Sequence, residues 1–231
     1  MDWLNFGLIF VGGISLCFAI FIWLINKKNR INIYFGISLA AVSFWVASEG
    51  IMLLVRDEQY VRLFGVMTYF FGLIVPFSFL FFSFYFPFEA RHFKKNLKII
   101  FWILLLAGLV VCIIPDLLVR QGVVGTNGVN NDMRVNPLGF WFYAVLFFLF
   151  FVWSFYNLIT KYINAQGYTK IQIRPILLGS LFLFVFASIF DLIIPYFEGE
   201  IFGWVGPYAT IIMLVAISYL LFFSGKKIYL E

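Results

Sequence analysis

The sequence predicts an all-α polytopic membrane protein: a seven-transmembrane helix bundle with its N-terminus outside and its C-terminus in the cytoplasm. Of the 231 residues, 64% are hydrophobic and only 12% are charged, a balance far from that of a soluble domain. Seven apolar stretches approach or exceed the roughly 20 residues that a helix needs to cross the hydrocarbon layer. Every second loop between these stretches is rich in basic residues and the loops between them are not, as in a polytopic membrane protein.

The seven apolar stretches run without the period-two alternation that transmembrane strands show, so each is expected to be a helix. No polar stretch between them is long enough to fold alone, and residues 1–231 are therefore expected to form a single domain. In order along the chain, the expected helices are Trp3–Ile25, Ile31–Val55, Leu63–Phe86, Ile99–Pro115, Leu138–Ile159, Pro175–Tyr196 and Phe202–Phe223.

Basic residues collect in every second loop and in the C-terminal tail. One side of the predicted membrane carries Lys27, Lys28, Arg30, Arg91, Lys94, Lys95, Lys98, Lys161, Lys170, Arg174, Lys226 and Lys227. The other side carries only Arg56, Arg62, Arg120 and Arg134, together with most of the acids. The positive-inside rule therefore places the first side in the cytoplasm. The net charge of +5 is explained by these short loops and indicates no nucleic-acid partner.

The longest predicted outer loop, from Pro115 to Gly139, contains the segment TNGVNND. Asn-Gly is a strong signal for a hairpin turn. Val123 and Val124 before the turn, with Met133 and Val135 after it, predict two short strands lying over the outer mouth of the bundle. An irregular loop is the alternative, and the sequence does not choose between the two.

No motif in the sequence predicts catalysis, a metal site or a cofactor. The single histidine, His92, lies in a basic loop, so neither a Ser-His-Asp set nor a Cys-His set can be assembled. Metalloprotease, Walker and nucleophile-elbow motifs are absent from the sequence. No lysine lies in the middle of the last apolar stretch, where a retinal-binding protein would need one.

Two acids lie at membrane depth, where a charge is costly and usually serves a function. Asp191 lies near the outer end of the sixth stretch, and Glu49 lies toward the outer part of the second, so both are expected at similar depth. For Asp191, ligand binding or proton sensing stands beside a structural role at the interface or at a helix kink. For Glu49 the structural role is the favoured interpretation.

Prolines interrupt three of the expected helices or their ends. Pro195 cannot donate a backbone hydrogen bond to residue 191, so a kink is expected beside Asp191. Pro76, Pro207 and Gly206 are further candidates for kinks or hinges. In each case a fixed packing kink is the alternative to a moving hinge.

In their order along the chain, several segments together resemble the seven-transmembrane N-terminal sensor region of bacterial histidine kinases, which other proteins couple to diguanylate cyclases. In FWVASEGIMLLV and MTYFFGLIVPFSFLFFSFYF, the residues Trp45, Glu49 and Pro76 match positions where this family tends to have a tryptophan, an acid and a proline. The segments KIQIRPILLGSLF, DLIIPYF and GWVGPYATIIMLVAISYLL resemble the entry to the sixth helix and the closing section. Asp191 departs from the family pattern, which has a neutral asparagine there.

The resemblance implies a sensor in the bacterial cytoplasmic membrane that binds an external or lipophilic small signal. Asp191, Glu49 and Trp45 are then the candidate ligand-binding residues. The last helix would carry a displacement to a cytoplasmic output domain, such as a histidine kinase, that is absent from this chain. The resemblance is also compatible with a homodimer. A small transporter or channel is the main alternative, and a structural membrane protein without a ligand is a third.

Overall fold

The computed structural model describes residues 2–88, 95–125, 130–198 and 204–218. His92, Lys94, Asn127, Lys226 and Lys227, on which parts of the predicted topology rest, lie outside these residues. So do positions 199–203 of the connection between the last two apolar stretches.

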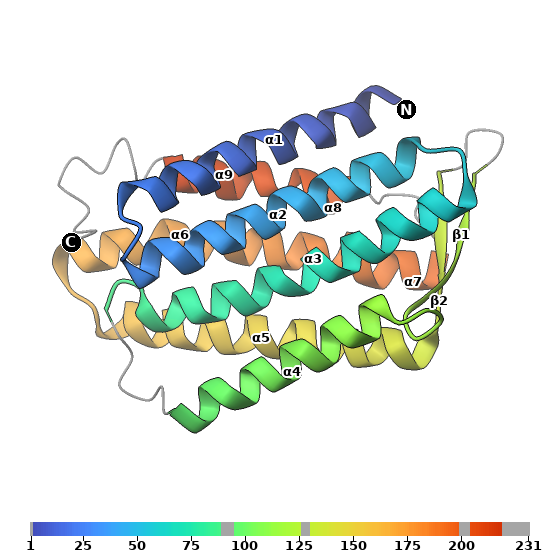
Figure 1. Cartoon of the computed structure of the whole chain (residues 1–231). Coiled ribbons are helices and arrows are strands. Elements are labelled where there is room, and N and C mark those ends of the chain that lie inside the picture. Colours follow the sequence, from blue (N-terminus) through green and yellow to red (C-terminus); the bar gives the residue numbers. More distant parts are fainter. Residues whose placement is uncertain (1, 89–94, 126–129, 199–203, 219–231) are drawn as a thin grey trace.

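The described chain is a bundle of long helices with one small hairpin at its end (Figure 1). Six helices are long and apolar enough to cross a membrane, and a shorter apolar helical stretch covers Val205–Val215. The elements are α1 (Asp2–Ile25), α2 (Arg30–Leu54), α3 (Glu58–Tyr85), α4 (Lys95–Ile113), β1 (Val119–Val123), β2 (Asp132–Val135), α5 (Pro137–Asn164), α6 (Gly167–Ala187), the π-helix η1 (Ser188–Ile193), α7 (Ile194–Glu198), α8 (Val205–Tyr208) and α9 (Thr210–Ser218).

The predicted order of helices is confirmed for the six long spans, but several helix ends were predicted wrongly. α6 begins at Gly167, eight residues before the predicted start at Pro175, which lies inside the helix. α3, α4 and α5 likewise extend several residues beyond their apolar stretches. An apolar stretch marks where a helix lies in hydrocarbon, whereas polar turns at its ends can continue into the interface.

Side-chain caps fix where three of the helices begin. Asn29, Asp57 and Asn136 precede α2, α3 and α5, and each accepts a hydrogen bond from the backbone N–H two residues later. Such caps satisfy one of the amide groups that the first turn of a helix leaves without a partner. Pro137 follows the last of these caps, at the helical position that tolerates proline best.

A seam of small and polar residues joins α1 and α2. Gly36, Ser43 and Gly50 recur every seven residues on α2 and meet the backbone of α1 at Ala19, Gly12 and Asn5. A Cβ atom added to Gly12 would lie 2.9 Å from the Ser43 carbonyl oxygen, and the Ser43 hydroxyl donates to the Gly12 carbonyl at 2.7 Å. Close backbone approach through small residues is how transmembrane helices gain contact in the absence of a hydrophobic driving force.

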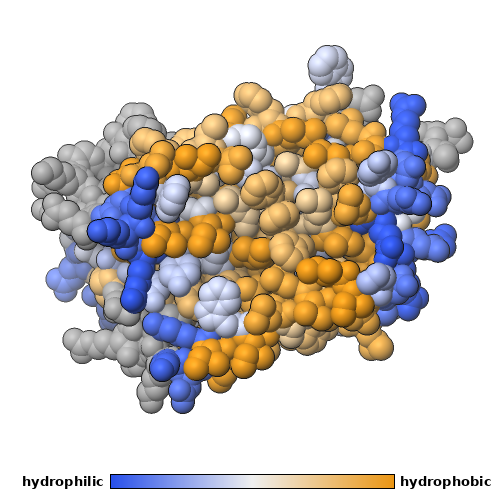
Figure 2. Space-filling view, in the orientation of Figure 1, coloured by the Kyte–Doolittle hydropathy of each residue, from blue (hydrophilic) through white to orange (hydrophobic). Residues whose placement is uncertain are grey.

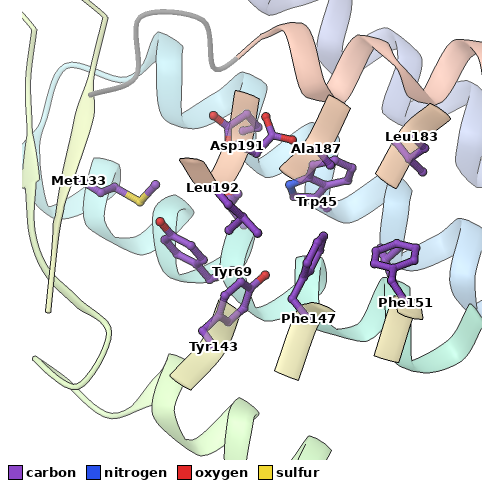
Figure 3. A pocket seen from close by; sticks show the side chains of 14 residues that line it. Trp45, Tyr69, Met133, Tyr143, Phe147, Phe151, Leu183, Ala187, Asp191 and Leu192 are labelled. Carbon is purple, nitrogen blue, oxygen red and sulfur yellow. The ribbon is translucent and has the colours of Figure 1, made fainter. Parts of the chain in front are cut away.

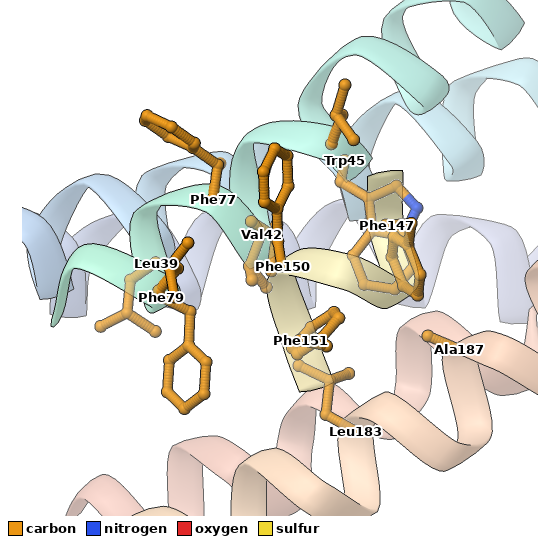
Figure 4. Packing of buried hydrophobic residues seen from close by; sticks show 14 of the residues in the cluster. Leu39, Val42, Trp45, Phe77, Phe79, Phe147, Phe150, Phe151, Leu183 and Ala187 are labelled. Atoms are coloured by element: carbon orange, nitrogen blue, oxygen red, sulfur yellow. The ribbon is translucent and has the colours of Figure 1, made fainter. Parts of the chain in front are cut away.

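Aromatic rings fill the interior between α3, α5 and α6. Phe77, Phe79, Phe150 and Phe151 are all buried and lie in one cluster with Leu183 of α6 (Figure 4). Their rings meet in tilted and edge-to-face pairs, such as Phe77 with Phe150 at 5.6 Å between centroids. These geometries suit the charge distribution of aromatic rings, so a large part of the phenylalanine content forms the core.

The hairpin prediction is confirmed. β1 and β2 pair in antiparallel fashion, with Val123 opposite Asp132 and Val119 opposite Val135. Val123, Met133 and Val135 are strand residues as expected, whereas Val124 lies just beyond β1. The Asn131 amide holds the hairpin to the end of α2 by donating to the carbonyl oxygens of Met52 and Val55 at 2.7 and 2.6 Å.

The molecule has an apolar belt between two polar ends (Figure 2). We call the end that carries β1 and β2 the hairpin end, and the N-terminus of α1 lies there too (Figure 1). The opposite end carries Lys27, Lys28, Lys95, Lys98 and Lys161, and we call it the basic end. The chain is thus a multi-pass membrane protein, and several of its described lysines gather at one end. Which end faces the cytoplasm stays a prediction.

Lys161, which the sequence places among the basic residues of a loop, joins two helices in the structure. It lies in the last turn of α5, is 6% exposed, and reaches across to the end of α3. Its ammonium group donates to the carbonyl oxygens of Ser83, Phe84, Phe86 and Phe88 at 2.6–2.9 Å. Since the last carbonyl groups of a helix have no partner within it, this side chain caps α3 and joins it to α5.

Candidate functional site

A cavity lies inside the bundle, between α2, α3, α5 and the stretch from α6 into η1, with β2 at its edge (Figure 3). Its free volume is about 30 Å³. A water molecule needs roughly 10–15 Å³ of such space, so the cavity has room for only a few small atoms in this conformation. The lining residues are Trp45, Glu49, Thr68, Tyr69, Gly72, Val75, Met133, Tyr143, Phe147, Phe151, Leu183, Ala187, Asp191 and Leu192.

The three predicted binding residues come together in this cavity. Trp45 and Glu49 are one turn apart on α2, and Asp191 reaches the cavity from η1. Trp45 and Glu49 are both buried, at 6% and 3% exposure. The sequence predicts that Glu49 and Asp191 lie at similar depth in the membrane, and in the structure both line the same cavity.

Asp191 is positioned by a break in the α-helical pattern. Residues Ser188–Ile193 form a π-helical turn, in which the N–H of Ile194 donates to the Ile189 carbonyl, and Pro195 follows at once. The structure thus has a π-turn beside Asp191, and the predicted kink at this place stays a prediction. π-turns inside α-helices occur frequently at functional sites.

The Asp191 carboxylate is enclosed yet lacks a hydrogen-bond donor. Both of its oxygens are buried, and no residue in the described part of the chain donates to either. Gly206 of α8 lies against this carboxylate, and an added Cβ atom there would overlap both oxygens. Gly206 therefore makes room for this carboxylate, and its action as a hinge stays a prediction.

Glu49 differs from Asp191 because it has a polar neighbour. Thr68 of α3 lines the same cavity as Glu49. The Thr68 hydroxyl donates to the Phe64 carbonyl at 2.9 Å, as hydroxyls in transmembrane helices often do. Sequence reasoning did not single out Thr68, since one threonine in an apolar helix gives no signal of its own.

Aromatic rings form the wall opposite the acids. Tyr69 and Tyr143 meet edge to face at 5.1 Å, and Figure 3 shows Tyr143 and Phe147 pointing from α5 toward the helix that carries Asp191. Gly72 leaves space for this wall, because a Cβ atom there would lie 2.8 Å from the Tyr143 hydroxyl. Sequence analysis missed these tyrosines, which cannot be distinguished from the other aromatic residues without the helix packing.

The hairpin covers one end of the cavity. Met133 of β2 lines the cavity and packs against Gly65 of α3, where an added Cβ atom would overlap its sulfur. The hydrogen bonds from Asn131 to α2 hold this cover in place. The hairpin thus separates the acids from the end of the bundle.

The remaining candidate residues lie outside the cavity lining. Pro76 is buried within α3, next to Val75, and Pro207 is buried in α8 next to Gly206. Pro195 lies in α7, after the π-turn. Their action as hinges stays a prediction. No group of His, Cys, Asp or Glu among the described residues is arranged to hold a metal ion.

The family model described as the N-terminal 7TM region of histidine kinase matches residues 7–225. No curated protein matches the chain significantly, and no solved structure does so either. The match covers the described helices from residue 7 of α1 onward and includes the cavity with Trp45, Glu49 and Asp191. The expected resemblance is therefore confirmed, and the chain belongs to the family of N-terminal seven-transmembrane regions of histidine kinases.

Proposed function

We propose that this chain is a receptor module that binds a small external or lipophilic signal in the cavity. Binding displaces helices and so changes the activity of a cytoplasmic output region such as a histidine kinase. The chain itself carries out no catalysis. The observation that carries the proposal is the buried Asp191 carboxylate, which faces a cavity without a donor in the described chain. A polar group left in this state is costly, and a ligand can supply what it lacks.

The cavity touches the elements best placed to move. A ligand shifts a conformational equilibrium only by binding two arrangements with different affinity, so its site must contact the moving part. Asp191 lies in the π-turn that follows α6 and packs against Gly206 of α8. α9 follows α8 and packs along α6. A signal at Asp191 would thereby reach α9, the last helix among the described residues.

The rest of the cavity wall belongs to a more rigid frame. Lys161 fastens α5 to the end of α3, and the small-residue seam fastens α1 to α2. We therefore propose that α6 and α9 shift relative to α3 and α5. In the predicted orientation, the hairpin end faces outside a bacterial cytoplasmic membrane and the basic end faces the cytoplasm.

Filling the cavity tests this function. Ala187 is 3% exposed and lines the cavity, so Ala187→Phe places a ring in the ligand's space. Val185, at 41% exposure, faces away from the core, so Val185→Phe is the matched control. With the chain fused to a histidine kinase output region, Ala187→Phe is expected to shift phosphorylation of the response regulator, and Val185→Phe is expected to leave it unchanged. Equal output from both variants and the parent would refute the proposal.

A transporter or channel would use the same buried acids for passage. Substrate-dependent flux in proteoliposomes containing the chain, with loss of flux in Ala187→Phe, would favour that alternative. The family match supports the sensor instead. A homodimer would suit signalling to a kinase, and it can be tested by crosslinking in native membranes.

A further inference from the structure

We propose that the signal is a compact ammonium cation, either ammonium itself or a short alkylammonium. This inference rests on the proposed function, because it assigns the chemistry of the ligand in the same cavity. It starts from two carboxyl groups enclosed together with aromatic rings, in a space too small for a bulky molecule.

The charge of the cavity points to a cation. None of the fourteen residues that line it is basic, whereas Glu49 and Asp191 both contribute carboxyl groups. The Asp191 oxygens have no donor in the described part of the chain, and the one hydroxyl hydrogen of the nearby Thr68 is already donated to the Phe64 carbonyl. Buried acids in membranes normally pair with a cation or with donors. An ammonium group would provide both a positive charge and several N–H donors.

The aromatic wall favours an ammonium group over a metal ion. Trp45, Tyr143 and Phe147 line the same space as the two acids. Aromatic faces attract alkylammonium cations through the negative charge above the ring. A metal ion would instead need a shell of oxygen ligands, and the described residues offer no cluster of three acidic, histidine or cysteine side chains.

The size of the cavity limits the ligand. A free volume of about 30 Å³ accommodates a group of one or two heavy atoms, on the scale of roughly 10–15 Å³ for a water molecule. Ammonium and methylammonium meet this limit. Larger quaternary cations would have to displace aromatic side chains or the hairpin residue Met133.

Equilibrium binding of radiolabelled methylammonium to the purified full chain in lipid nanodiscs tests the assignment. Saturable binding is expected, with displacement by unlabelled ammonium but not by equal concentrations of sodium chloride or of neutral ethanol. Asp191→Asn and Glu49→Gln keep the side-chain shapes and remove the charges, so each is expected to weaken binding by about tenfold or more. The control Asp116→Asn alters an acid that is 72% exposed at the hairpin end and is expected to bind as the parent does.

Thermal unfolding of each variant shows that it is folded before its binding is compared. If Asp191→Asn or Glu49→Gln does not fold, the displacement series on the unaltered chain decides the question. Displacement by sodium chloride or ethanol, or equal affinity in folded Asp191→Asn and the parent, would overturn the ammonium assignment. Absence of saturable binding would overturn it as well, and is the result expected if protons neutralise the two carboxyl groups. In either case the sensor proposal stands as long as Ala187→Phe alters kinase output, and it fails on its own if that output is unchanged.

Discussion

Replacing Lys161 by methionine tests whether one buried ammonium group joins two helices at the basic end. Methionine keeps the length and apolar character of the side chain but removes its N–H donors. The carbonyl groups of Ser83, Phe84 and Phe86 would then be buried without this partner. At about 1 kcal/mol for each carbonyl group, the loss in unfolding free energy is about 3 kcal/mol.

Thermal unfolding in detergent, followed by tryptophan fluorescence, would measure this loss. For a chain of this length, 1 kcal/mol corresponds to about 2–4 °C, so Lys161→Met is expected to lower Tm by about 6–12 °C. Lys28→Met makes the same chemical change at an exposed position of the basic end and is expected to leave Tm nearly unchanged. Equal Tm values for the two variants would show that Lys161 is not the clamp that its contacts indicate.

Three further predictions address the seam, the hairpin and the topology. Gly12→Leu would force a side chain against the Ser43 carbonyl and is expected to cost about 1–3 kcal/mol in unfolding free energy, whereas Gly13→Leu enters open space and is expected to cost none. Asn131→Ala leaves two carbonyl groups of the α2 end without their donor, and faster amide hydrogen exchange in β1 and β2 is expected, with unchanged exchange contradicting the proposed anchor. A cysteine at position 127 is expected to react with an impermeant reagent on intact cells, and reaction only after permeabilisation would reverse the predicted orientation.

The predicted ligand site was partly accessible from the sequence. Glu49 and Asp191 stood out because a charge inside an apolar stretch is costly, and Trp45 followed from the family resemblance. Thr68, Tyr69 and Tyr143 could not be found in this way. A tyrosine among many aromatic residues becomes part of a site only through the rotation of its helix and the neighbours that it meets.

The role of Gly206 shows a second limit. A glycine beside a proline predicts a flexible joint, and that action stays untested. The structure adds that Gly206 gives space to the Asp191 carboxylate across the bundle. Such a contact joins residues fifteen positions apart through two separate elements, and no local pattern encodes it.

Hydropathy and loop charge were enough to predict a polytopic helical membrane protein, because a membrane-spanning segment must satisfy its backbone internally and must be apolar over its length. The Asn-Gly signal and the valines near it predicted the hairpin strands for the same kind of local reason, while the Asn-Gly turn itself lies outside the described residues. Which helices touch, and therefore that Lys161 caps α3 and that Asp191 shares a cavity with Glu49, was decided by the tertiary structure. An apolar helix face can contact lipid or another helix equally well, so hydrophobicity alone does not select the packing partner. The partner depends on close fit and on polar contacts between distant segments.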